Sequence, residues 1–104
     1  MPSARLAQLE RLLAADPHDP FVLYGLAQEH AKAGNIAEAL SFFDRCIAAD
    51  TDYLYAYYHK AKVLADADRA PEAIAVLRAG IPRATARQDS KALSELRALL
   101  DSLE

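Results

Sequence analysis

The sequence repeats with a period of 34 residues, and this period limits the folds that the chain can adopt. After a shift of 34 positions, small residues fall on small residues and bulky apolar residues on bulky apolar ones. The coinciding pairs are Tyr24 with Tyr58, Ala27 with Ala61, Ala31 with Ala65, Ala39 with Ala73, Leu40 with Ile74, Phe43 with Leu77 and Ile47 with Ile81. A period of this length is typical of a supersecondary unit that buries its apolar face by stacking on its neighbours.

The first segment joins the same pattern when the shift is reversed. Leu6 then falls on Leu40 and Leu9 on Phe43. The chain therefore contains more than two copies of this apolar pattern, although the first copy is only half a unit long.

Six short helices are predicted, because apolar residues recur at spacings of three and four along most of the chain. Ser3, and Asp19 followed by Pro20, are typical helix starts, and Gly34 can take the left-handed conformation that ends a helix. The expected helices span about 3–15, 20–33, 36–50 and 53–67. A fifth helix begins near Pro71 and contains Pro82, and a last one starts at 89 or 90.

Three positions are less straightforward. Asn35 is expected to cap the third helix, with Glu38 completing a capping-box-like pair. Pro82 removes one backbone donor inside the fifth helix, so we expect a kink or an early end there. The aromatic segment 53–58 has a strand-like composition, but it lies between a helix start and a helical continuation.

Composition excludes several classes of partner. The net charge is −3 and no run of like charge exceeds two residues, so a nucleic-acid partner is not expected. Uncharged segments are too short to span a bilayer, and Met1-Pro2-Ser3 leads directly into an amphipathic segment rather than a secretory signal. The single cysteine, Cys46, lies in an apolar helical pattern and is expected to be buried in a protein of a reducing compartment, the cytoplasm.

The repeat resembles the tetratricopeptide repeat, a helix–turn–helix unit of about 34 residues. In that family each helix of a unit carries a small residue where the two helices cross. A large apolar residue follows four positions after the small residue of the second helix. The matching residues are Ala27 and Ala61, Ala39 and Ala73, and Phe43 and Leu77. The departures are Leu23 and Tyr57 at the usual tryptophan, Lys60 at a usual leucine, and Thr51 at a usual closing proline.

The resemblance implies an all-α fold, a right-handed α-solenoid of antiparallel helix pairs, in one domain covering 1–104. Residues 20–53 and 54–87 would form two repeats. Residues 3–19 would be the second helix of a preceding unit, and 88–104 a C-terminal capping helix.

The resemblance also implies a peptide-binding groove, since the first helix of each pair lines the concave surface in this family. The positions carried over are Phe21, Tyr24, Gln28 and Lys32 from one helix, and Tyr55, Tyr58, His59, Lys62 and Asp66 from the next. Tyrosine suits recognition because it combines apolar area with a polar tip. Tyr24 and Tyr58 can also be ordinary boundary residues, and Tyr57 is expected in the core.

The expected function is therefore a non-catalytic adaptor or scaffold that binds a protein or peptide segment. The family's clamp for a terminal carboxylate is not matched, but Lys32, Lys62 and His59 allow a weak preference for an acidic segment. Two alternatives remain open at this point. The chain can associate with itself as a homodimer through the leucines of 88–104, or it can be an accessory subunit of an enzyme complex.

Catalysis has little support in the sequence. His18, His30 and His59 are isolated and lack metal-ligand spacing, and no glycine-rich phosphate loop occurs. We expect no enzyme activity, no cofactor and no metal.

Overall fold

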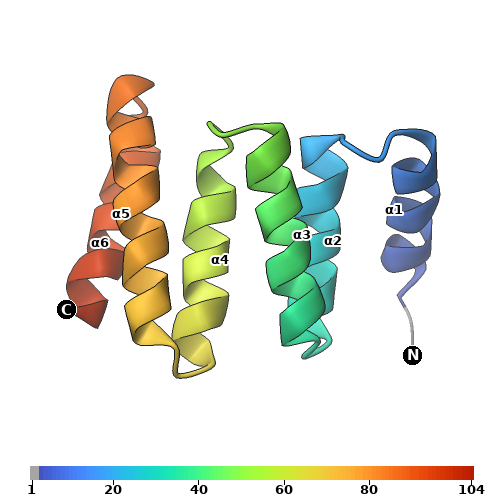
Figure 1. The fold of residues 1–104 in the computed structure, drawn as a ribbon, viewed down its shortest axis with the longest axis horizontal. Coiled ribbons are helices and arrows are strands. Elements are labelled where there is room, and N and C mark those ends of the chain that lie inside the picture. Colours follow the sequence, from blue (N-terminus) through green and yellow to red (C-terminus); the bar gives the residue numbers. More distant parts are fainter. Residues whose placement is uncertain (1–2) are drawn as a thin grey trace. The chain divides into compact units, whose positions relative to one another are not determined.

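A computed structural model describes residues 3–104, in which six α-helices and no strands occur. The helices are α1 (Ala4–Ala15), α2 (Pro20–Lys32), α3 (Ile36–Ala49), α4 (Leu54–Asp66), α5 (Ala70–Ala86) and α6 (Ser90–Leu103) (Figure 1). They fall into two compact units. The N-terminal unit, Met1–Asp50, holds α1 to α3, and the C-terminal unit, Thr51–Glu104, holds α4 to α6.

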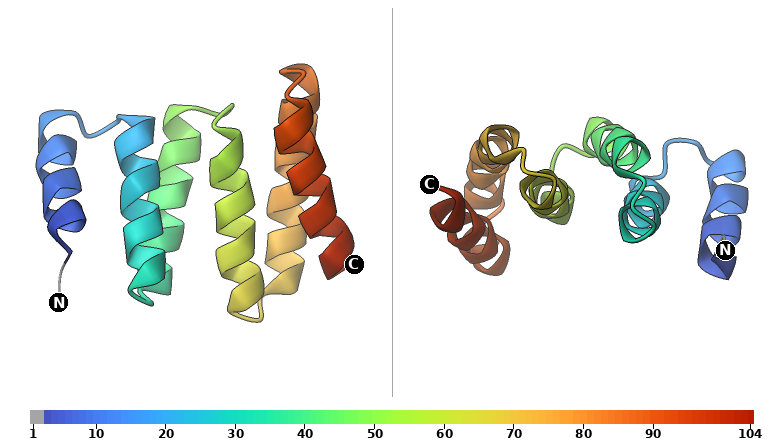
Figure 2. Two further views of the ribbon diagram at one scale, coloured as in Figure 1. Left: turned by 180° about the vertical axis from the view of Figure 1, so that it is seen from behind. Right: turned by 90° about the horizontal axis from the view of Figure 1, so that it is seen from below.

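Consecutive helices within each unit run in opposite directions and lie side by side (Figure 2). The pairs α2–α3 and α4–α5 fall inside the residue ranges 20–53 and 54–87 that the period indicates. The exact repeat boundaries remain a prediction from the sequence.

Three of the six helix starts are confirmed by hydrogen bonds of the expected kind. The hydroxyl of Ser3 accepts from the amide of Leu6 at 2.9 Å, and the carboxylate of Asp19 accepts from the amide of Phe21 at 2.9 Å. Asp89 does the same for the amide of Ala92 at 3.0 Å, which places the start of α6 at Ser90. Each bond satisfies an amide that the first helical turn leaves without an intrahelical partner.

Three helices end at a residue in the left-handed conformation, and the sequence indicated this only for Gly34. Gly34 has φ +81°, as expected, and Asp68 and Gln88 also take left-handed conformations at the ends of α4 and α5. The residue after each reaches back to a carbonyl of the last turn, as in the bond from the Arg69 amide to the Leu64 carbonyl at 2.8 Å. This is the C-terminal closure that normally favours glycine.

Two local expectations are wrong. Asn35 makes no side-chain cap bond to α3, because its amide group lies 3.3 Å from His30 Nδ1 and is directed to the preceding helix instead. Of the kink or early end expected in the fifth helix, the early end is wrong, because α5 does not stop at Pro82 but continues to Ala86. Pro82 and Arg78, whose carbonyl loses its amide partner, are both exposed, so water can hydrate that carbonyl.

The core of the N-terminal unit joins all three of its helices. Leu9 of α1 packs with Val22 and Leu26 of α2, and the partly buried Leu6, Leu13 and Phe42 surround them. Between α2 and α3, the buried side chains are Leu23, Ala27, Ala39, Phe43 and Cys46.

The core of the C-terminal unit repeats this arrangement with a compensating change of size. At the positions of Leu23 and Cys46, the second copy has Tyr57 and Gly80. Tyr57 is only 6% exposed, as predicted, and its hydroxyl donates to the Thr51 carbonyl at 2.7 Å. A Cβ atom at Gly80 would lie 2.9 Å from the Cβ and Cγ atoms of Tyr57, so the larger ring is accommodated because Gly80 has no side chain.

We expect Gly80→Ala to destabilise the protein by about 1–3 kcal/mol, because the added methyl meets the base of the Tyr57 side chain, which cannot move freely. Gly25→Ala is the matched control. Its new methyl would meet the flexible ends of Leu9 and Arg5, and the better helix propensity of alanine offsets the crowding. Urea unfolding followed by circular dichroism measures both, and equal stability changes would contradict the packing account.

Candidate functional site

The nine predicted groove residues lie on two helices, one in each unit. Helix α2 carries Phe21, Tyr24, Gln28 and Lys32, and helix α4 carries Tyr55, Tyr58, His59, Lys62 and Asp66. Each helix is the first member of its antiparallel pair. The surroundings of the two faces differ, so each is described in its own unit.

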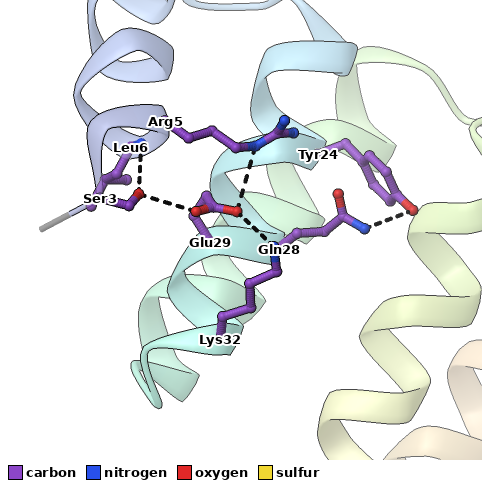
Figure 3. Close-up of polar contacts among 7 residues, drawn as sticks. All are labelled: Ser3, Arg5, Leu6, Tyr24, Gln28, Glu29 and Lys32. Atoms are coloured by element: carbon purple, nitrogen blue, oxygen red, sulfur yellow. Dashed lines mark hydrogen bonds and ion pairs between the residues drawn. The ribbon is translucent and has the colours of Figure 1, made fainter.

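On α2, an exposed aromatic side chain precedes a more constrained one. Phe21 is 65% exposed, the largest value for a bulky apolar residue in the described part of the chain. Tyr24 is half-buried, with its ring edge-on to Phe43 at a centroid distance of 6.2 Å. Its hydroxyl accepts from the Gln28 side-chain amide at 3.2 Å (Figure 3). Tyr24 therefore contributes to the fold as well as to the surface.

Glu29, which the sequence analysis missed, is the central charged group of this region. Its side chain is only 9% exposed, and its carboxylate accepts from the Ser3 hydroxyl at 3.1 Å and from the Lys32 ammonium at 3.2 Å (Figure 3). Arg5 forms a third contact, with its Nε atom 3.5 Å from Glu29. The bond from Lys32 lowers the pKa of Glu29 below its ordinary value, with Ser3 and Arg5 adding to this against the opposing effect of burial.

On α4, three rings form a chain of edge-to-face contacts. The rings of Tyr55 and Tyr58 lie 6.5 Å apart at an interplanar angle of 73°, and those of Tyr58 and His59 lie 5.2 Å apart at 88°. All three residues are half-buried, whereas Lys62 and Asp66 further along α4 are exposed.

Helix α6 supplies the charge that acts on these rings. Burial raises the pKa of Tyr55, and a hydrogen bond to Glu95 of α6 raises it further. Burial lowers the pKa of His59, and Lys62 adds to this, while Glu95 works in the opposite direction. The pKa of His59 is therefore below its ordinary value of 6.5, which favours the neutral ring at pH 7.

These contacts argue against the expected preference for an acidic segment. Of the three groups on which it rested, Lys32 is bound to Glu29 and His59 is neutral. Lys62 is exposed and lies outside that ion pair, whereas the Lys32 side chain is 74% exposed but paired with Glu29.

Cys46, His30 and His18 lie outside the predicted groove positions. Cys46 is buried and its thiol donates to the Pro20 carbonyl at 3.3 Å, while burial, with Asp50 nearby, raises its pKa to about 12. His30 stacks on Phe42 at 5.4 Å, and His18 is exposed. Within residues 3–104, no three His, Cys, Asp or Glu side chains are grouped as metal ligands.

The leucines of α6 are used inside the C-terminal unit. Helix α6 packs against α5 and α4, Leu96 is 1% exposed, and the other four leucines are partly buried. The hollow on its exposed face is lined by Ser90, Leu93, Ser94, Arg97, Ala98 and Asp101. Because Ser90, Ser94, Arg97 and Asp101 interrupt Leu93 and Ala98, this face has no continuous apolar patch for a second copy. No helix in the described range is long and apolar enough to cross a bilayer.

Comparisons with known proteins agree with this architecture. A family model described as subunit 3 of the anaphase-promoting complex, or cyclosome, matches residues 5–80. A tetratricopeptide repeat domain protein from Salinibacter ruber is 40% identical, with a TM-score of 0.79 over 86% of this chain and 90% of that one. Among curated proteins, no sequence matches the chain.

Two more distant structures share the fold. The TPR2B domain of yeast Sti1, in complex with pHsp70, has a TM-score of 0.87 at 18% identity, covering 94% of this chain and 78% of that one. The type III secretion translocator chaperone SycD of Yersinia enterocolitica has a TM-score of 0.85 at 15% identity, covering 94% and 68%. At these identities the likeness shows the fold alone, and with the Salinibacter relative it confirms an all-α helical repeat.

Glu29→Gln should make amide hydrogen exchange in α1 about two- to fivefold faster at pH 7, because the contacts of Ser3 and Arg5 hold α1 to α2 and such pairs are worth less than about 1 kcal/mol. The folded pKa of Glu29 is lowered, so this stabilisation is present above its ordinary value of 4.5 and is lost as pH falls through the folded pKa. Glu10→Gln, on the exposed side of α1, is the matched control. Equal exchange rates in the two variants would refute the role of Glu29.

Iodoacetamide should alkylate Cys46 at least about 100-fold more slowly in the native protein than in urea at pH 8, because the buried thiol is almost entirely protonated. Mass spectrometry of timed samples measures both rates. Similar rates in the two conditions would show that Cys46 is accessible and that its assignment to the core is wrong.

Proposed function

The chain belongs to the tetratricopeptide repeat family, and we propose that this protein-interaction module binds a segment of another protein through the first-helix faces of α2 and α4. The positions involved are those carried over from the family: Phe21, Tyr24, Gln28, Lys32, Tyr55, Tyr58, His59, Lys62 and Asp66. The module acts by binding and not by catalysis.

The exposure of Phe21 is the observation that carries this proposal. A phenylalanine side chain that is 65% exposed has no role in the core of the N-terminal unit, and its large apolar area is suited to a partner. The half-buried Tyr24, Tyr55 and Tyr58 add rigid aromatic area with polar tips. On the second helices, by contrast, Phe43 is fully buried and serves the core.

The relatives support binding of protein segments in general terms. One of the similar structures is a complex with pHsp70 and another is a translocator chaperone. The buried, free Cys46 fits a reducing compartment, and we place the protein in the cytoplasm as part of this proposal. The polar outer face of α6 gives no specific support for a homodimer through that helix.

Selection from a random peptide display library, followed by calorimetry on the enriched peptides, tests the proposal. Phe21→Ala should weaken binding about tenfold, because truncating a central aromatic anchor typically costs more than about 1 kcal/mol. Leu12→Ala is the matched control, since Leu12 is 54% exposed but lies on α1, outside the first-helix faces. We expect it to change affinity less than twofold.

Three results would count against the proposal. The library would yield no reproducible peptide, or Phe21→Ala would bind as well as wild type, or Leu12→Ala would lose as much affinity as Phe21→Ala. Circular dichroism of both variants establishes that their helical content is unchanged.

A further inference from the structure

In the C-terminal unit, a half-buried carboxylate lies beside the aromatic residues of α4. Helix α6 packs against α4 as well as α5, and this contact brings the carboxylate of Glu95 close enough to Tyr55 to raise the pKa of its hydroxyl. The negative charge of Glu95 also acts on His59, where the positive charge of Lys62 acts in the opposite direction and more strongly. We call Tyr55, Tyr58, His59 and Glu95 the aromatic–acidic cluster.

The rings of the cluster favour positive charge. The face of a tyrosine ring carries negative electrostatic potential, which attracts an ammonium or guanidinium group placed over it. Tyr55 and Tyr58 meet edge to face rather than stacked, so their faces are not covered by each other. The neutral His59 beside them adds no positive charge to cancel that of Glu95.

A comparison with Glu29 shows what the cluster lacks. Both residues are partly buried, Glu29 on α2 and Glu95 on α6, but Glu29 has Lys32 and Arg5 within 3.5 Å. Glu95 lies instead beside the neutral hydroxyl of Tyr55, and no ion pair found within residues 3–104 includes it. A partly desolvated carboxylate gains most from a charge-assisted hydrogen bond, so a cation supplied from outside would be stabilised there.

We propose that the aromatic–acidic cluster receives a positively charged side chain, lysine or arginine, of the partner segment. The proposal rests on the proposed function and names the chemistry of the partner. It reverses the weak preference for an acidic segment that Lys32, Lys62 and His59 indicated in the sequence. The aliphatic stem of the incoming side chain would lie along the tyrosine rings, with its charge at the Glu95 carboxylate.

A titration with a small probe tests the cluster apart from any peptide. N-acetyl-arginine amide added to the ¹⁵N-labelled protein should shift the amide resonances of Tyr55, Tyr58, His59 and Glu95. N-acetyl-citrulline amide, which has nearly the same shape and no charge, should not. Glu95→Gln should abolish the shifts, while Asp101→Asn, the same charge change on the exposed face of α6, should leave them intact.

The peptides from the display selection supply the second arm. Enriched sequences should contain a lysine or arginine whose replacement by glutamine weakens binding about tenfold, and Glu95→Gln should weaken the parent peptide by a similar factor. In the Glu95→Gln protein the glutamine peptide and its parent should bind equally well. Asp101→Asn should bind as wild type.

The outcomes separate this inference from the proposed function. Peptides that bind without a basic residue, or with no loss in Glu95→Gln, overturn the inference and leave peptide binding standing. Arginine shifts that disappear in Glu95→Gln, with no enriched peptide, support the cation site and contradict peptide binding. Absence of both the shifts and the peptides overturns both.

Discussion

The close packing of the second helix of each pair on the first is the constraint on which the rest of the structure depends. Ala27 and Ala39 in one unit, and Ala61 and Ala73 in the other, are fully buried, and their small size lets the paired helices approach. Each pair then uses one face of its first helix for the core. Other positions of the first helices carry side chains that are half-buried or exposed, as Tyr24, Tyr55 and Phe21 are.

Much of the fold could be predicted because its signals are local. Ser3, Asp19 and Gly34 act within a few residues of themselves, and the period of 34 carries the pairing of buried positions such as Ala27 with Ala61. The second unit has the larger Tyr57 in place of Leu23, and it has the smaller Gly80 in place of Cys46. Both changes occur at the spacing of 34 residues. The failures at Asn35 and Pro82 are also local, but there a neighbouring helix and solvent satisfied groups that the sequence rule assigned to the helix itself.

The electrostatic part of the candidate site could not be read from sequence. Ser3 and Glu29 are 26 residues apart, and Glu95 reaches Tyr55 from a different helix, so neither contact has a spacing rule. The charges of Lys32 and His59 look available on a helical wheel. In the folded units Glu29 binds Lys32, and burial lowers the pKa of His59, so the partner that we propose is basic and not acidic.

Intermolecular nuclear Overhauser effects between the protein and an enriched peptide test the central claim most directly, since they locate the bound segment on the helices themselves. The account predicts contacts from the peptide to the ring protons of Phe21 and Tyr24 on α2 and of Tyr55 and Tyr58 on α4. Contacts confined to the exposed sides of α3 and α5 would contradict it.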